Sequence, residues 1–212
     1  MSIADLRKEY KWTALSREDL DADPLRQFQK WLQAALDGGL VEPNAMTLAT
    51  ADRTGKPSAR TVLLRGVDER GFSFFTNYES RKGRELSENP CAALVFYWAE
   101  LERQVCVAGS VTRLSPAESE AYFRTRPRGS RLAAWASRQS EVISSRAELE
   151  ERFRELEKLH PDDSVPLPSC WGGFVLSPSR IEFWQGRPNR LHDRFCYIRK
   201  ADHGWTIERL SP

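Results

Sequence analysis

Hydrophobic positions near the start of the chain follow a helical period. Asp23 stands at an N-cap position, Pro24 follows at the first helical position, and Gly38-Gly39 ends the pattern. The apolar face comprises Phe28, Trp31, Leu32 and Ala35. We therefore predict an amphipathic helix between Asp23 and Gly38. Residues 1–20 are more polar, and we expect them to form a mobile N-terminal arm.

From Ala45 the period shortens to that of β-strands. Short β-branched or aromatic runs alternate with turn sequences such as DRTGKP, DERG and SENP. The runs are AMTLATAD, SARTVLLRGVD, GFSFFTNY, CAALVFYWA and RQVCVAGSVTRLS. Because the turns between them are short, we expect most neighbouring strands to be antiparallel.

Three helical segments interrupt the strands before the chain ends in β-structure. Ser115 and Glu118 form a capping box, RGSRLAAWASRQS is typical of a short helix, and Ser145 caps a third helix. The third helix carries the apolar stripe Leu149, Phe153 and Leu156. CWGGFVLS, RIEFWQG and RFCYIRKADHGWTIERL are expected to be the last three strands. About eight strands with peripheral helices predict a mainly β, α+β fold, an antiparallel barrel forming one domain over residues 21–212.

Composition narrows the classes of partner. The 212 residues carry 32 basic and 30 acidic side chains, a net charge of +2, which gives no global electrostatic case for nucleic acid. No apolar run approaches the ~20 residues of a membrane span, and the first residues lack the apolar core of a signal peptide. We expect a cytoplasmic protein whose anion sites are local.

The cysteines and histidines do not indicate a metal site. Four scattered cysteines lack CxxC spacing, and each lies in or beside an apolar run, so we expect small buried side chains without disulfides. Three histidines form no ligand cluster in the sequence, and we predict no metal site.

One helix start carries an unusual charge pattern. In TNYESRKGREL, Ser80 is the expected N-cap of a short helix that begins with Arg81 and Lys82. Cations are unfavourable at a helix N-terminus, which attracts anions instead. A bound phosphate would explain their placement. The alternative is a basic surface turn, and the stretch alone does not decide between the two.

Other cationic groups allow the same two interpretations. ARTVLLRG carries Arg60 and Arg65, which flank an apolar strand either with bound partners or in solvent. AYFRTRPRGSR offers Tyr122, Arg126, Arg128 and Ser130, donors that can hold a second phosphate or simply face water. The sequence has none of the common nucleophile, zinc-protease, P-loop or dinucleotide motifs. We therefore expect any chemistry to be carried by a bound organic cofactor.

The stretch IEFWQGRPNRLHDR, from Ile181 to Arg194, resembles the C-terminal signature of the pyridoxine/pyridoxamine 5'-phosphate oxidase family. RTVLLRG, FFTNYESRKGREL, LERQV, YFRTRPRGS, SRQS, VPLPSCWGGF and ERLSP also resemble blocks of that family, in order. The resemblance implies a homodimer of split β-barrels with one FMN per subunit at the dimer interface. It implies oxidation of pyridoxine or pyridoxamine 5'-phosphate to pyridoxal 5'-phosphate, with oxygen reduced to hydrogen peroxide.

The same resemblance implies the site residues. The FMN site would comprise Arg60, Thr61, Val62, Leu63, Leu64, Arg65, Phe75, Thr76, Ser80, Arg81, Lys82, Gln104, Gln139, Ser140, Trp184 and Arg194. The substrate site would comprise Arg7, Lys8, Glu9, Tyr10, Arg65, Tyr122, Arg126, Ser130, Arg190, Leu191 and His192. Arg190 and His192 would act at the carbon being oxidised, with His192 available to accept a proton.

The chain departs from the family pattern at two places. Arg65 stands where the family usually has lysine, and Arg131-Leu-Ala-Ala replaces the more usual Gln-Ile-Gly. Two alternative functions stay open at this point. One is a related FMN oxidase acting on another aromatic, such as a phenazine precursor. The other is a non-catalytic flavin or pyridoxal-phosphate binding protein.

Overall fold

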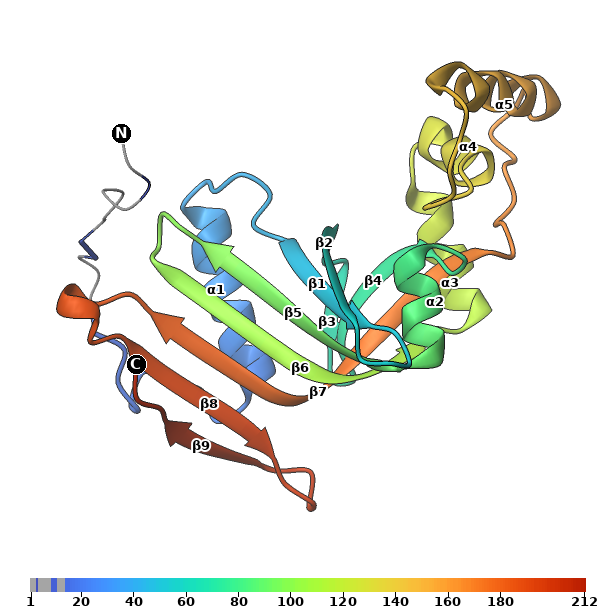
Figure 1. The fold of residues 1–212 in the computed structure, drawn as a ribbon. Coiled ribbons are helices and arrows are strands. Elements are labelled where there is room, and N and C mark those ends of the chain that lie inside the picture. Colours follow the sequence, from blue (N-terminus) through green and yellow to red (C-terminus); the bar gives the residue numbers. More distant parts are fainter. Residues whose placement is uncertain (1–2, 4–8, 11–13) are drawn as a thin grey trace.

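The computed structural model describes residue 3, residues 9–10 and residues 14–212 (Figure 1). The predicted substrate residues Arg7 and Lys8 lie outside the described residues. Within the described part of the chain, no helix has the length and apolar character needed to cross a membrane.

Residues 14–212 form five α-helices and nine β-strands. The helices are α1 (Pro24–Asp37), α2 (Arg81–Glu88), α3 (Pro116–Thr125), α4 (Arg128–Ala136) and α5 (Arg146–Leu159), with a short 3-10 turn η2 (Pro188–Arg190). The strands are β1 (Ala45–Ala51), β2 (Pro57–Leu63), β3 (Gly66–Asp68), β4 (Gly71–Asn77), β5 (Cys91–Trp98), β6 (Arg103–Arg113), β7 (Trp171–Gln185), β8 (Asp193–Arg199) and β9 (Trp205–Arg209).

The strands form one antiparallel sheet that curls into a half-barrel (Figure 1). Its order is β2-β1-β5-β6-β7-β4-β3, and β8 and β9 extend from β7. Strand β7 joins the parts, because its first residues pair with β4 and its last residues pair with β8. The predicted mainly β, antiparallel fold with peripheral helices is confirmed.

A β-bulge bends the sheet where β6 meets β7. The register shifts between Ala108 and Gly109, opposite Pro178. Glycine is needed there, since a Cβ on Gly109 would lie 2.0 Å from the carbonyl oxygen of Ser177. A bulge also tolerates a proline, which cannot donate to the ladder. The bend lets one strand serve two differently directed parts of the sheet.

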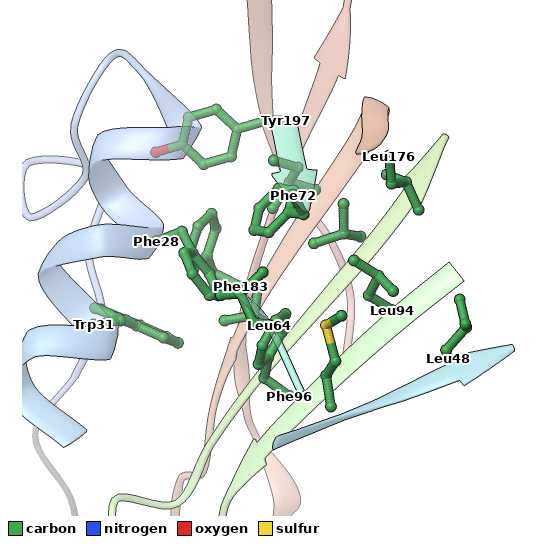
Figure 2. Close-up of a cluster of buried hydrophobic side chains, with 14 of the residues drawn as sticks. Phe28, Trp31, Leu48, Leu64, Phe72, Leu94, Phe96, Leu176, Phe183 and Tyr197 are labelled. Carbon is green, nitrogen blue, oxygen red and sulfur yellow. The ribbon is translucent and has the colours of Figure 1, made fainter. Parts of the chain in front are cut away.

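The main core lies between α1 and one face of the sheet (Figure 2). Phe28 is fully buried and meets Phe72 and Phe96 with ring centroids 4.9 and 4.8 Å apart. Trp31 meets Phe183 of β7 edge-on at 5.2 Å. Truncating such an aromatic to alanine costs about 3–5 kcal/mol. The helix predicted from Asp23 is confirmed, with the Asp23 side chain accepting from the backbone N–H of Leu25.

A smaller core fixes the helical end of the molecule. Phe123 of α3, Leu132 of α4, Val165 and Trp171 are buried together. The predicted Ser115–Glu118 capping box opens α3, and Ser145 caps α5. In α5, Phe153 and Leu156 of the predicted stripe are partly buried against this core. These contacts pack α3, α4 and α5 against the beginning of β7.

Several strand boundaries differ from the prediction. CWGGFVLS and RIEFWQG are one strand, β7, because the bulge absorbs Pro178, which in the sequence indicates a break. The run SARTVLLRGVD divides into β2 and β3. The last predicted strand also divides, into β8 and β9, at a turn after Arg199.

Two other expectations meet the structure at single residues. All four cysteines are free thiols, and the prediction that they are buried holds for Cys196, whereas Cys106 and Cys170 are half-buried and Cys91 at the start of β5 is exposed. Its side chain points outward because β5 has one solvent face there. Leu15 and Leu20, which fall in the expected arm, are buried in the core, and the Leu15 N–H donates to Asp193 Oδ2 at 3.0 Å. The mobility of residues 1–20 stays a prediction.

Candidate functional site

A cavity of about 660 Å³ opens where β2, β4, α2, α3 and α4 meet. It brings together thirteen of the residues predicted from the resemblance. They are Arg60, Thr61, Val62, Leu63, Arg65, Phe75, Thr76, Arg81, Lys82, Tyr122, Arg126, Gln139 and Ser140. Both predicted cationic groups, from the start of α2 and from the end of α3, thus face the same space.

The start of α2 is built as predicted. Ser80 is fully buried and its Oγ accepts from the Gly83 N–H at 3.2 Å, which makes it the N-cap. Gly83 permits this tight turn, since a Cβ there would lie 2.2 Å from the carbonyl oxygen of Tyr78. The Arg81 N–H donates to Ser140 Oγ at 3.1 Å. The helix start therefore holds its two cations, Arg81 and Lys82, at the cavity.

Lys82 is the most buried cation of the cavity, with 9% of its surface exposed. Its Nζ donates to Gln139 Oε1 at 2.9 Å and to Ser80 Oγ at 3.3 Å, both neutral acceptors. Burial, and then the nearby charge of Arg60, lower the pKa of Lys82 to about 8. A buried ammonium held by neutral oxygens and close to another cation is suited to a bound anion.

The opposite side of the cavity is aromatic and cationic. Phe75 stacks on Tyr122 at 3.9 Å, and Trp171 lies nearly parallel to Phe75 at 5.6 Å. The Arg126 guanidinium lies 4.6 Å from the Trp171 ring, and Arg65 lies 5.8 Å from the Tyr122 ring. Within the described residues, Arg126 Nη1 is buried and has no hydrogen-bond partner. Burial lowers the pKa of Arg126, as expected for a cation that lacks an acid.

Trp171 belongs to this wall but is absent from the predicted residue set. It lines the cavity at the first position of β7. Its sequence signal is the WGGF run, where Gly172 and Gly173 allow Tyr78 and Phe75 to approach closely. Taken from the sequence alone, that run indicates only the start of a strand.

A second set of predicted residues lies elsewhere, in one row across three strands. Gln104 of β6 pairs with Trp184 of β7, which pairs with Arg194 of β8. The neighbouring Phe183 faces α1, so the alternation along β7 turns Trp184 to the opposite face of the sheet. Arg194 is held by Glu182, whose Oε1 accepts from its Nε at 2.8 Å. These three residues, on the face of the sheet opposite α1, are called the flat-face row below.

The end of the flat-face row carries His192. The ring centroids of Trp184 and His192 lie 4.7 Å apart. The Tyr10 ring meets these two rings edge-on, with centroids 5.5 and 5.4 Å away. His192 Nδ1 accepts from the Arg187 N–H at 3.1 Å, so the neutral ring carries its hydrogen on Nε2. Burial and then Arg190 lower the pKa of His192, against an opposing effect of Asp193. The ring is therefore neutral near pH 7 and offers a donor.

Arg190 stands beside His192 in a strained turn. Its φ is +60°, and that of the preceding Asn189 is +58°. Left-handed backbone costs a non-glycine residue of the order of 1 kcal/mol and concentrates at functional sites. Leu191, also predicted for the substrate site, is 69% exposed. The turn thus displays Arg190 and Leu191 outward.

The remaining predicted residues take other places. Leu64 is buried in the main core, Glu9 is exposed, and Ser130 lies in the first turn of α4 outside the cavity lining. Arg128, named with the second cationic group, donates instead to backbone carbonyls at the end of α5, including that of Asp162 at 3.0 Å. No group of three or more potential metal-ligating side chains occurs among the described residues.

The cavity and the flat-face row lie at opposite ends of β7, the long strand whose course Figure 1 shows. Trp171 lines the cavity and Trp184 belongs to the row, thirteen positions along the same strand. At ~3.3 Å per residue about 40 Å of strand lies between the two, a path that the bulge at Pro178 bends. One chain therefore cannot bring both sets onto a single small ligand.

Comparison with known proteins places the chain in a family. Residues 32–160 match the family described as pyridoxamine 5'-phosphate oxidase, and residues 171–212 match the pyridoxine 5'-phosphate oxidase C-terminal dimerisation region. Proteins named pyridoxine/pyridoxamine 5'-phosphate oxidase are 59% identical in Cyanothece sp., over 100% of this chain and 99% of theirs, and 59% identical in Rubrobacter xylanophilus, over 99% and 96%.

Solved structures agree with this. PhzG from Burkholderia lata 383, in complex with tetrahydrophenazine-1-carboxylic acid, is 31% identical with a TM-score of 0.90, covering 97% of this chain and 100% of its own. A pyridoxamine 5'-phosphate oxidase-related, FMN binding protein from Nostoc punctiforme shares the fold at 22% identity, with a TM-score of 0.72 and coverage of 90% and 98%. By full-length sequence identity and by both matched regions, the chain belongs to the pyridoxamine 5'-phosphate oxidase family.

Proposed function

We propose that the protein is an FMN-dependent oxidase that converts pyridoxamine or pyridoxine 5'-phosphate to pyridoxal 5'-phosphate and reduces oxygen to hydrogen peroxide. The observation that carries the proposal is one cavity with two separate cationic anchors. Arg81 and Lys82 stand on one side, and Arg65 and Arg126 stand on the other, around an aromatic wall. Two anchors suit two phosphates, one on the cofactor and one on the substrate.

The residues present fit FMN at the first anchor. Lys82 is a buried ammonium without an acidic partner among its hydrogen bonds, and it lies in the first turn of α2, where the helix dipole favours an anion. Nearby, Thr76 Oγ1 donates a hydrogen bond to Gln139 Oε1 at 3.3 Å, and both side chains line the same cavity. When bound, the flavin would supply the acceptor for a hydride from the substrate.

The second anchor fits the substrate phosphate. Arg126 Nη1 is buried without a partner in the described part of the chain, and a phosphate oxygen would satisfy it. Tyr122 stands beside it with its ring stacked on Phe75. The stacked rings exclude water and leave a flat surface, which suits a pyridine ring. Arg65 lies over the Tyr122 ring and adds a further guanidinium to this anchor.

We propose that each complete site is assembled from two chains of a homodimer. The flat-face row does not reach the cavity of its own chain, because about 40 Å of strand β7 lies between them. The matched dimerisation region, residues 171–212, contains Trp184, His192 and Arg194. A two-fold axis would place one chain's row over its partner's cavity, once for each of two sites.

In that arrangement Arg190 and His192 would orient the substrate group being oxidised. His192 Nδ1 already accepts from the Arg187 N–H, so the free ring atom is the Nε2–H donor. This favours a hydrogen bond from His192 to the substrate amine nitrogen or alcohol oxygen over removal of a proton by the neutral ring. Arg190, exposed on its strained turn, would add a cation beside it. Residues 21–212 would act as a single unit in the cytoplasm.

The test compares substrates with and without phosphate. The purified protein should release FMN, and it should form peroxide from pyridoxamine 5'-phosphate but hardly from pyridoxamine. An oxidase for a phenazine-type substrate, the class of molecule bound in the PhzG complex, would show no need for the phosphate. A binding protein would take up the ligands and form no peroxide. Equal rates with and without phosphate would contradict the proposed substrate class.

A further inference from the structure

A buried carboxylate lies directly behind the first cationic anchor. Glu85 is on α2, one turn after Arg81, and its side chain is 7% exposed. It is not part of the cavity lining and is not among the predicted site residues. Its contacts nevertheless join three residues that do line the cavity, Ser58, Arg60 and Arg81.

Both oxygens of the Glu85 carboxylate are occupied by donors. Oε1 accepts from Arg81 Nε at 2.8 Å. Oε2 accepts from Ser58 Oγ at 2.6 Å and from Arg60 Nη2 at 3.3 Å, and it also accepts from Thr50 Oγ1. One side chain of α2 thereby connects α2 to both β1 and β2.

The carboxylate is ionised at neutral pH. Burial alone would raise the pKa of Glu85, but the hydrogen bonds from Ser58, Thr50, Arg81 and Arg60 outweigh it and lower that pKa to about 2. Its charge therefore faces Arg60 and Arg81 permanently. The charge that acts on Lys82, the next residue along α2, is that of Arg60 and not that of an acid.

Arg60 is held on every side by this arrangement. Its Nη1 donates to the Leu48 carbonyl at 3.2 Å and to Thr50 Oγ1 at 2.5 Å, and its Nη2 donates to Ser58 Oγ and Glu85. A guanidinium fixed in this way loses little side-chain entropy when a ligand binds. Without the carboxylate, Arg81 would lose the acceptor of its Nε, and Arg60 would lose the one acidic partner among its four contacts.

We propose that Glu85 is a positioning residue for the cofactor phosphate, holding the guanidinium groups of Arg60 and Arg81 at the cavity. The inference rests on the proposed assignment of this anchor to the FMN phosphate. Removing the carboxylate has two opposing effects, because it frees the arginines but also removes a negative charge near an anion site. The first effect dominates, since four donors already satisfy the carboxylate and it has no surface in the cavity.

The test is ligand binding to the apoprotein, with FMN and riboflavin compared. Riboflavin has the same ring system but no phosphate. In Glu85→Gln, the Kd for FMN should rise about tenfold, the size of one lost charge-assisted contact, while the Kd for riboflavin stays within about twofold. Glu88→Gln is the matched control, since it makes the same change at an exposed position of the same helix and should alter neither Kd.

A milder variant covers the case in which Glu85→Gln does not fold. Thr50→Val keeps nearly the same volume but removes one donor to Glu85 and one acceptor from Arg60, and it should raise the FMN Kd in the same direction by about threefold. Equal weakening of FMN and riboflavin would mean a general structural role and would overturn the inference. So would an unchanged FMN Kd in both variants.

One further variant separates this failure from failure of the anchor itself. Lys82→Met removes a cation that lines the cavity directly. If Lys82→Met weakens FMN binding and Glu85→Gln does not, the inference about Glu85 is wrong and the anchor stands. If Lys82→Met also leaves FMN binding unchanged, both the anchor and the role of Glu85 are wrong.

Discussion

Lys82 Nζ lies 2.9 Å from Gln139 Oε1, a contact between residues 57 positions apart that closes the cavity around an ammonium group. The ammonium has no acid among these hydrogen-bond partners, so its charge is available to a ligand. We predict that Lys82→Met raises the Kd for FMN roughly ten- to a hundredfold. Fluorescence titration of the apoprotein measures this. Lys82→Arg, which keeps the charge, should retain most of the affinity.

The same contact predicts a pH dependence. Burial lowers the pKa of Lys82 to about 8, so the apoprotein loses this charge as the pH rises through that value. The FMN Kd should therefore increase between about pH 7.5 and 9.5, and Lys82→Arg should flatten that rise because arginine stays charged. Apoprotein stability should move the other way. Between about pH 8 and 10.5 the Lys82 side chain is protonated in the unfolded chain but not in the folded one. The free energy of unfolding therefore increases with pH over this range.

Arg126 should show a conflict between stability and function. Its Nη1 is buried without a partner among the described residues, which is unfavourable in the apoprotein. We predict that Arg126→Met raises KM for pyridoxamine 5'-phosphate at least about tenfold. The Tm of the apoprotein should stay equal or increase, because an unsatisfied cation is replaced by an apolar chain. A lower Tm together with an unchanged KM would assign Arg126 to the fold rather than the site.

Arg65 stands where the resemblance to the family implies a lysine, and we predict that it binds the substrate phosphate. The alternative is a surface ion pair with an acid such as Asp68 or Glu69. Asp68 is already paired with Arg70 at 2.7 Å, and Arg65 lies over the Tyr122 ring in the cavity. Arg65→Ala should raise KM for pyridoxamine 5'-phosphate by roughly ten- to a hundredfold, about 1.5–3 kcal/mol, and should weaken FMN retention. Arg65→Lys should be active. Steady-state kinetics that leave KM and FMN occupancy unchanged in Arg65→Ala would remove it from the site.

The local parts of this molecule could be predicted from the sequence because they depend on neighbours in the chain. Ser80 as an N-cap and the cations that follow it are an example, and the helix after Asp23 is another. The predicted break between two strands at Pro178 is wrong, because the bulge that accommodates this proline depends on Gly109 of another strand.

Parts of the site depend on contacts between distant residues and were not predictable from periodicity. Glu85 has the spacing of an ordinary helical partner of Arg81, four positions away, and its contacts with Thr50 and Ser58 arise only when α2 packs on β1 and β2. Trp171 joins Phe75 and Tyr122 from three separate segments. The family resemblance supplied the flat-face row, but the sequence did not indicate that this row lies at the other end of β7 from the cavity, about 40 Å along the strand.

That separation leads to a test by subunit complementation. Lys82→Met damages the cavity, and Trp184→Ala damages the flat-face row. In a heterodimer of the two variants, one site combines an intact cavity from one chain with an intact row from the other, and the second site carries both defects. Random exchange makes half the dimers mixed, so about a quarter of wild-type sites should reappear. FMN occupancy and peroxide formation would be measured at limiting FMN, with each variant taken through the same exchange alone as the control. If each site lay within a single chain, the mixture would never exceed the average of its two parents.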